Sequence, residues 1–262
     1  MTDRQKSFSR RSLLAAGAAF ALPLGSRTEL LGLSFAAPRP SAPGGAKPGR
    51  SLLPQLFGEE IRRIPTDERV VALTFNAAWN EDGIDTVLDG LRARGVPATF
   101  FLTGRFAESH PEAAEALAAE HGVASHSYSH PELDDLDAQG LREEVARADE
   151  AIRWATGAEP LPFYRFPYSE TSPDAIAEVN ALGYADIEFT DDTLGYLGEA
   201  GGIGVDDAVA RAVAAIGPGT ILQMHLGASD GSGPNVDSRA LPYIVDAVES
   251  RGYAVIDLGS LV

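Results

Sequence analysis

The chain of 262 residues contains no cysteine and almost no lysine, and each absence excludes a class of chemistry. Without cysteine there is no thiol nucleophile, no disulfide and no thiolate zinc site. The only two lysines, Lys6 and Lys47, precede the region that has the pattern of a folded domain. Schiff-base catalysis and lysine-dependent phosphate loops are therefore excluded from that region.

Positive charge is also scarce, because 21 Lys and Arg residues stand against 38 Asp and Glu residues, for a formal net charge of -17. No basic stripe is present that would neutralise phosphates, so nucleic acid is not expected as a partner. Hydrophobic residues make up 44% of the chain, which is enough to bury a sizeable core. Length and composition together predict one α/β domain preceded by a tail.

Residues 1–37 are expected to be an export signal rather than part of the fold. A basic patch within residues 4–11 precedes an uncharged run, Ser12 to Leu24, which is too short to span a bilayer. The pair Arg10-Arg11 before Ser-Leu-Leu resembles a twin-arginine export signal, with an ordinary secretory signal as the alternative. The mature protein is then extracellular or associated with the cell wall, or periplasmic in a host with an outer membrane. No later segment is apolar enough to predict a membrane span.

The next residues, 38–68, are expected to be a linker or an arm. Residues 38–50 are rich in Pro and Gly, which is typical of a flexible lead-in. Residues 51–68 are ambiguous, because their apolar residues can also pack on the domain: Leu52, Leu53, Leu56 and Phe57. The folded domain is expected to occupy residues 69–262.

From residue 69 onward, short apolar runs alternate with amphipathic stretches. Seven runs are predicted strands: Val70–Phe75, Thr99–Thr103, Gly122–Ser125, Phe163–Phe166, Ala185–Phe189, Thr220–Met224 and Ala254–Asp257. The clearest predicted helix has Asp137 as its N-cap and stops before Gly157. Seven strands alternating with helices predict a parallel sheet. Periodicity alone leaves open whether that sheet closes into a barrel.

Polar residues follow these runs at the carboxyl ends of the strands, where parallel sheets carry their chemistry. In chain order they are Asn76, His126, His130, Arg165 to Tyr168, Asp191, Asp192 and His225. Three of the five histidines of the chain are among them. A single residue of this kind would be read as an ordinary rim side chain, but polar groups after five of the seven predicted strands predict one shared pocket.

In order and spacing, these segments resemble the motifs of the polysaccharide deacetylase family, also called the NodB homology or carbohydrate esterase 4 family. The second and third motifs are intact as His126-Ser127-Tyr128-Ser129-His130 and Arg165-Phe166-Pro167-Tyr168. The other three are altered: Thr-Phe-Asp-Asp is Thr74-Phe75-Asn76-Ala77, Asp-x-x-Asp-Trp is blurred in residues 192–196, and Leu-x-His is Gln223-Met224-His225. The resemblance covers about residues 69–258.

The resemblance implies an α/β fold, an irregular (β/α)7 barrel, that removes N-acetyl groups from chitin-like or peptidoglycan-like glycans. It implies a divalent metal, usually zinc, on His126 and His130 and on a carboxylate of the first motif. It also implies that His225 is the general acid and that Arg165 orients the base. A backbone N–H near Tyr168 would help to hold the oxyanion. Asn76 and Asp192 complete the implied site.

Elementary chemistry supports much of this site. Zinc takes two or three protein nitrogen or oxygen ligands and an open position, and two histidines four residues apart converge when the chain between them turns tightly. Ser127 is placed to brace that loop. Arg165 lies in an apolar segment and needs an anionic partner if it is buried, for which Asp191 or Asp192 is expected. The alternatives are a pair of surface histidines, a purely structural ion pair, and a core His225 bonded to a carbonyl.

The first motif lacks both of its acids. Asn76 accepts no proton at neutral pH, which removes a general base that contributes roughly 10²–10⁴ in rate. Ala77 leaves two imidazoles for the metal, so weaker binding is expected. The nearby acids Glu81, Asp82 and Asp85 are not expected to replace the missing base. Asp82 is expected to cap a helix, and Asp85 is expected to lie on that helix.

Trp79 is expected either to stack on a sugar at the mouth of the site or to pack under the following helix. Three functions remain open from the sequence. The first is a slow, exported deacetylase of N-acetylated glycans, and the second is a homologue that binds glycan without hydrolysis. The third is another hydrolytic α/β domain, which the absence of a G-x-S-x-G nucleophile motif disfavours.

Overall fold

The computed structural model of the chain describes residues 51–227 and 235–262. The export signal expected at residues 1–37 and the lead-in expected at 38–50 lie outside these residues. Across the part that is described, no helix has both the length and the apolar character needed to cross a membrane.

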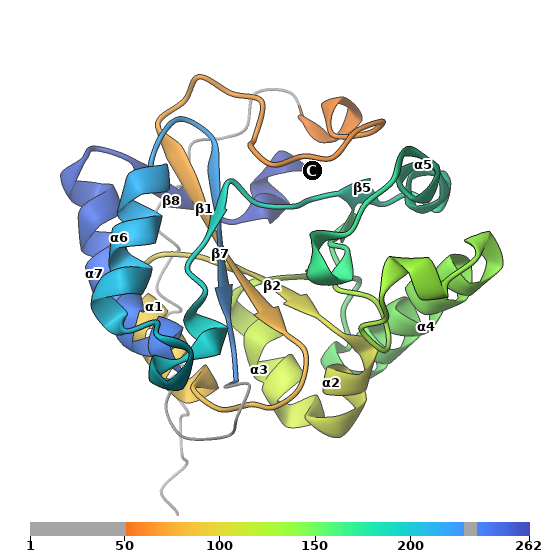
Figure 1. The fold of residues 1–262 in the computed structure, drawn as a ribbon, viewed down its shortest axis with the longest axis horizontal. Helices are drawn as coiled ribbons and strands as arrows, with labels where there is room; N and C mark the ends of the chain where they lie inside the picture. Colours follow the sequence, from red (N-terminus) through yellow and green to blue (C-terminus); the bar gives the residue numbers. More distant parts are fainter. Residues whose placement is uncertain (1–50, 228–234) are drawn as a thin grey trace, which may run out of the picture. The chain divides into compact units, whose positions relative to one another are not determined.

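One curled parallel sheet forms the centre of the molecule, with the strand order β5-β4-β3-β2-β1-β7-β6 and with β8 beside β1 (Figure 1). Its strands are β1 (Val70–Ala77), β2 (Thr99–Leu102), β3 (Gly122–Ser125), β4 (Phe163–Tyr164), β5 (Ala185–Asp186), β6 (Asp191–Asp192), β7 (Thr220–His225) and β8 (Ala254–Ile256). Neighbouring strands of this sheet pair in parallel. The fold is the irregular α/β barrel that the resemblance of the motifs implies.

All seven predicted strands are present, and their ends differ from prediction in an informative way. β1 and β7 run past their apolar residues to include Asn76, Ala77 and His225, because the ladder between them continues to the pair Asn76 and His225. β4 and β5 have only two residues each. The short strand β6 (Asp191–Asp192) was not predicted, since two aspartates give no apolar run.

Seven helices of the described residues pack around the outside of the curled sheet (Figure 1). They are α1 (Ile84–Arg94), α2 (Gly104–Ser109), α3 (Pro111–Glu120), α4 (Ala138–Thr156), α5 (Pro173–Ala181), α6 (Val205–Ala215) and α7 (Val236–Ser250). As predicted, α4 begins at Asp137, whose side chain accepts a hydrogen bond from the Gly140 N–H at 2.7 Å, and ends at Gly157. The expected cap of α1 by Asp82 is wrong, because Gly83 occupies the N-cap position.

Residues 51–68 pack against the sheet. Leu56 is fully buried in the apolar core on the inner face of the curled sheet, called the inner core below. Ile61 pairs with Ile187, just beyond β5, and Arg63 pairs with Thr220 at the start of β7. This segment therefore links the β5 end of the sheet to β7, which neighbours the other end.

The side chains of β1 alternate between two apolar cores. Val71, Leu73 and Phe75 belong to the core between the sheet and the helices, whereas Ala72 belongs to the inner core. Since successive strand side chains point to opposite faces, Asn76 shares the inner face with Ala72.

β7 follows the same alternation. Leu222 and Met224 join the outer core, and Ile221 joins the inner one. Gln223 and His225 therefore share the inner face of the sheet with Asn76, which is the register partner of His225.

Candidate active site

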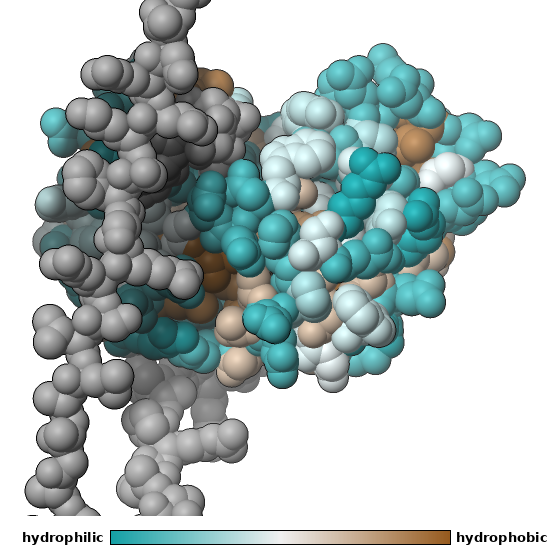
Figure 2. All heavy atoms as spheres, turned by 90° about the horizontal axis from the view of Figure 1, so that it is seen from below, coloured by the Kyte–Doolittle hydropathy of each residue, from teal (hydrophilic) through white to brown (hydrophobic). Residues whose placement is uncertain are grey.

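A pocket of about 710 Å³ opens beyond the carboxyl ends of these strands. Six of the seven predicted site residues line it: Asn76, His126, His130, Tyr168, Asp192 and His225. The seventh, Arg165, is fully buried beside them. Seen from below, the part of the surface that Figure 2 leaves uncovered is mostly hydrophilic, with small separate apolar patches.

His126 directly follows β3, and its imidazole is 2% exposed. Its Nδ1 lies 2.9 Å from the carbonyl oxygen of Arg165, so Nδ1–H donates there and Nε2 keeps its lone pair. Burial, reinforced by the neighbouring His130, holds the pKa of His126 well below its usual range. The neutral imidazole is the form that binds metals.

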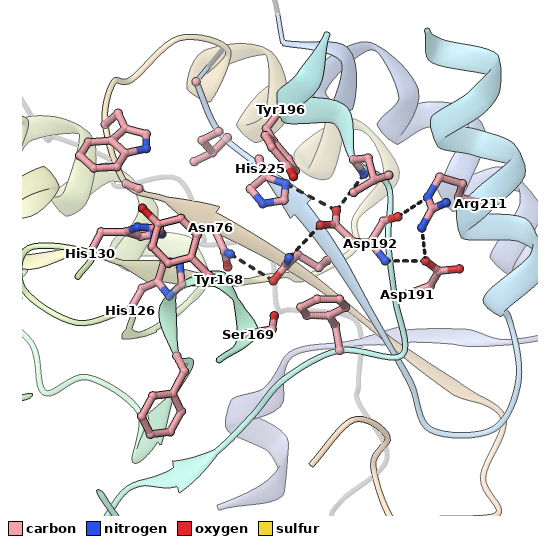
Figure 3. A pocket seen from close by; sticks show the side chains of 18 of the residues that line it. Asn76, His126, His130, Tyr168, Ser169, Asp191, Asp192, Tyr196, Arg211 and His225 are labelled. Atoms are coloured by element: carbon pink, nitrogen blue, oxygen red, sulfur yellow. Dashed lines mark hydrogen bonds and ion pairs between the residues drawn. The ribbon is translucent and has the colours of Figure 1, made fainter. Parts of the chain in front are cut away.

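His130 faces His126, with ring centroids 4.9 Å apart at 83° (Figure 3). Burial also lowers the pKa of His130, and its Nδ1 is buried without a hydrogen-bond partner. The His130 backbone N–H donates to Ser127 Oγ at 3.0 Å, so Ser127 braces the loop. Glu144 of α4 accepts from the N–H groups of Tyr128 and Ser129 at 2.9 and 2.7 Å.

Left-handed backbone concentrates at this pocket. Five described residues other than glycine have positive φ angles between 57° and 66°: Ser127, His130, Tyr168, Ser169 and Leu194. All belong to loops that line the pocket or hold its histidines. Such a conformation costs a non-glycine residue roughly 1 kcal/mol or more. The surrounding hydrogen bonds therefore hold these loops in shapes that place side chains at the expense of stability.

Among residues 51–227 and 235–262, no third side chain joins His126 and His130 as a possible metal ligand. In the part of the chain that the structure describes, no group of three His, Asp or Glu side chains is arranged to hold a metal. Ala77 is buried in the outer core. The acids Glu81, Asp82 and Asp85 line a different pocket, against α3.

The predicted ion pair of Arg165 with Asp191 or Asp192 is wrong. Asp191 instead pairs with Arg211 at 2.6 Å. The guanidinium donates to oxygens of Ile187, Glu188, Thr74 and Asn76 at 2.9–3.1 Å and lies 3.9 Å from the Phe101 ring centroid. Burial lowers the pKa of Arg165 to about 10, which leaves it charged at neutral pH. Carbonyl, hydroxyl and amide oxygens thus take the place of the expected carboxylate.

His225 ends β7 beside two carboxylates. Its Nδ1 lies 3.7 Å from Asp192 Oδ1 and 3.8 Å from Asp237 Oδ2, and Asp237 Oδ2 also accepts from the His225 backbone N–H at 2.8 Å. In the described part of the chain, the buried Nδ1 of His225 has no hydrogen-bond partner, so the alternative of a bond from this nitrogen to a backbone carbonyl is not observed there. Gly195 is required here, because a Cβ at that position would lie 2.3 Å from Asp237. Figure 3 shows the imidazole turned towards Asp192 at the pocket wall.

Two aromatic rings border the His130 side of the pocket. Trp79 is 59% exposed with its ring centroid 5.4 Å from that of His130, and Tyr168 is 58% exposed at 4.6 Å. Of the two alternatives for Trp79, the structure therefore shows the position at the mouth. Exposed rings beside polar groups are typical of sites that bind ligands with both apolar and polar faces.

Sequence reasoning gave no role to Gln223 or to the buried acids Asp186 and Glu188. Gln223 is 5% exposed and bonds to Asn76 at 3.1 Å and to Asp192 at 3.0 Å. Its one sequence signal is an amide inside the apolar run of β7. Asp186 and Glu188 are fully buried, and their proximity raises the pKa of Arg165 against the larger effect of burial. In the sequence, the unusual feature that could have identified them is the presence of acids within a predicted strand.

The family model of polysaccharide deacetylases matches residues 63–187. A chitooligosaccharide deacetylase of Bradyrhizobium sp. (strain ANU 289) is 33% identical over 203 residues, which make up 74% of this chain and 90% of that protein. This chain belongs to the polysaccharide deacetylase family. Membership places it among carbohydrate deacetylases, hydrolases that act on carbon–nitrogen bonds other than peptide bonds.

Two further comparisons extend this result. A peptidoglycan-N-acetylglucosamine deacetylase of Bacillus cereus is 26% identical over 198 residues, which make up 75% of this chain and 70% of that protein. A solved structure of a CE4 family pseudoenzyme from Bacillus anthracis matches with a TM-score of 0.69 at 24% identity, over 78% of this chain and 69% of that one. The second match shows a shared fold.

Proposed function

We propose that this protein binds N-acetylated glycans of the chitin or peptidoglycan type and removes their N-acetyl groups, with a divalent metal held by His126 and His130. The observation that carries the proposal is the convergence of two neutral imidazoles, His225 and the buried Arg165 at one aromatic-edged pocket. The names of its relatives, chitooligosaccharide and peptidoglycan-N-acetylglucosamine deacetylases, support this class of substrate.

The two histidines fit a metal. His126 Nδ1 is engaged by a carbonyl, which leaves Nε2 for a ligand, and His130 has a buried nitrogen without a partner. Imidazole nitrogens and an open coordination sphere suit zinc among the divalent metals. When bound, the metal supplies Lewis-acid polarisation of the acetamide carbonyl. With no carboxylate at Ala77, we expect weaker binding than at a site with three protein ligands.

The remaining residues of the pocket have roles that their geometry supports. Trp79 and Tyr168 offer faces for sugar rings at the mouth. His225 donates a proton to the leaving nitrogen as the carbon–nitrogen bond breaks, and Asp192, 3.7 Å from its Nδ1, stabilises the charged imidazole. Asn76 takes no proton from the attacking water, so turnover is expected to be slower by roughly 10²–10⁴ than at a site with a working general base in that position.

We further propose that residues 1–37 direct export through the twin-arginine route. The support is the Arg10-Arg11 pair and the short uncharged run that follows it. An exported location also agrees with the substrate, because chitin-like and wall glycans lie outside the cytoplasm.

A second candidate is a protein that binds N-acetylated glycans without hydrolysing them. The observation that favours it is the state of position 76, where a fully engaged amide stands between Arg165 and Gln223 in place of a base. The alanine at position 77, where the family motif has an acid, also favours this second candidate.

Metal analysis and glycan titration separate these candidates. Purified wild type is expected to bind zinc at one equivalent, to lose it in His126→Ala and to keep it in His121→Ala, which alters a histidine outside the pocket. Calorimetry with a tetramer of N-acetylglucosamine should show binding, and mass spectrometry should show zinc-dependent acetate release. Glycan binding without acetate release selects the second candidate. A protein that binds neither zinc nor the glycan would contradict both candidates.

A further inference from the structure

Gln223 lines the pocket and completes an unbroken chain of hydrogen bonds there. Figure 3 draws the part of this chain between Asn76 and Asp192 as dashed lines. Arg165 Nη1 donates to Asn76 Oδ1 at 2.9 Å, and Asn76 Nδ2 donates to Gln223 Oε1 at 3.1 Å. Gln223 Nε2 then donates to Asp192 Oδ2 at 3.0 Å. At the far end, the Leu194 backbone N–H donates to Asp192 Oδ1 at 2.8 Å.

Both ends of this chain are fixed as donors. A guanidinium has no acceptor, and the backbone N–H of Leu194 only donates. Residue 76 must therefore turn an oxygen towards Arg165, and residue 192 must turn an oxygen towards the Leu194 N–H. Gln223, between them, has one NH₂ donor group and one oxygen acceptor. The atoms that residues 76 and 192 turn towards Gln223 must therefore be one acceptor and one donor. A carboxylate accepts at both of its oxygens, whereas an amide accepts at one end and donates at the other.

The chain is consequently satisfied only when one of the two positions is an acid and the other an amide. Two acids leave an oxygen facing an oxygen, whichever way the Gln223 amide turns. Two amides leave a donor facing a donor. Asn76, Asp192 and Gln223 are 7%, 9% and 5% exposed, so water gives a mismatched atom little compensation, and a buried unmatched polar group is costly.

We propose that Gln223 is a positioning residue that decides which carboxylate the site keeps. With Gln223 in place, the site retains the charge of Asp192 beside His225 and requires an amide at position 76. The loss of the base at Asn76 is then tied to the glutamine that stands where the Leu-x-His motif has leucine. Restoring an acid at position 76 alone leaves two carboxyls that can both bond to Gln223 only when one of them holds a proton, so the site loses either the base at position 76 or the charge of Asp192.

A set of thermal unfolding measurements tests this pairing without any assay of activity. Asn76→Asp and Asp192→Asn each break the pattern, whereas the double variant exchanges acid and amide with no change in charge or shape. We expect the Tm of the double variant to be about 3 °C or more higher than the value calculated by adding the Tm shifts of the two single variants to the wild-type Tm. Additive shifts would overturn the proposal.

Repulsion between two acids at positions 76 and 192 also favours the exchange, so the same cycle is repeated in a Gln223→Leu background. Leucine removes the demand for one donor and one acceptor but leaves charge repulsion in place. We expect the excess Tm to fall by more than half there. An equal excess in both backgrounds would show that Gln223 has no positioning role.

Acetate release supplies a second readout, which rests on the proposed function. Asn76→Asp combined with Gln223→Leu is expected to release acetate from N-acetylglucosamine oligomers about 10-fold or more faster than Asn76→Asp alone. Equal measurable rates would contradict the positioning role. If no variant releases acetate but the Tm excess depends on Gln223, the hydrolytic function fails and the pairing stands.

Discussion

Asp186 should make the protein less stable as the pH rises from 7 to 9. Both of its carboxyl oxygens are buried without a hydrogen-bond partner. Burial, followed by the nearby acids Glu188 and Glu60, raises the pKa of Asp186 to about 9. The folded protein therefore keeps this proton up to about pH 9, whereas the unfolded chain releases it near its usual pKa of about 3.9.

A folded state that holds more protons than the unfolded state loses stability as the pH rises. One proton changes the free energy of unfolding by about 1.4 kcal/mol per pH unit, which gives a loss of about 2 kcal/mol between pH 7 and pH 9. Burial also raises the pKa of Glu188, which adds to the same slope. The lowered pKa values of His121, His126 and His130 act below about pH 6.5, outside this window.

Urea unfolding at pH 7, 8 and 9, followed by circular dichroism, measures this slope. Asp186→Asn keeps the shape of the side chain but does not titrate, so it should flatten most of the slope, and Glu188→Gln should remove the remainder. Asp67→Asn, at an exposed loop position, should leave the wild-type slope unchanged. A wild-type free energy that is constant from pH 7 to pH 9, or an unchanged slope in Asp186→Asn, would refute the reasoning.

Three further predictions address the arm, a helix cap and the mouth of the pocket. Leu56→Ala should lower the free energy of unfolding by roughly 2–5 kcal/mol in urea titration, because Leu56 is fully buried in the inner core; a loss below about 0.5 kcal/mol would contradict the packing of residues 51–68. Asp137→Ala should cost about 1 kcal/mol by removing the N-cap of α4, and no loss would discount its bond to Gly140. Trp79→Ala should weaken calorimetric binding of N-acetylglucosamine oligomers by about 10-fold with the Tm unchanged, whereas Trp154→Ala, the other exposed tryptophan, should not; equal effects would refute a role for Trp79.

Sequence patterns were sufficient for seven of the eight strands of the described residues, because these depend on local alternation. The run Val70–Phe75 and the cap and stop signals Asp137 and Gly157 each found their element. The order of polar residues after the strands also placed six of the seven predicted site residues in one pocket, since the carboxyl ends of parallel strands meet at one edge.

The partners of the buried charges were not predictable in the same way. Charge complementarity suggested an aspartate for Arg165, but the register of β1 against β7 brings Asn76 and Gln223 together instead, and no local pattern reveals that register. The positive φ angles of Ser127 and Tyr168 could not be predicted from the sequence either, because serine and tyrosine do not indicate a left-handed backbone as glycine does. Long-range contacts therefore decided the details that set the chemistry.

Diffraction from zinc-soaked crystals of the wild-type protein, recorded at the zinc absorption edge, tests the central claim most directly. The claim is that the pocket holds a metal on two imidazoles beside His225. The account predicts one strong anomalous peak about 2.1 Å from a ring nitrogen of His126 and of His130. An absence of zinc from these two residues at saturating concentration, or a peak elsewhere only, would contradict it.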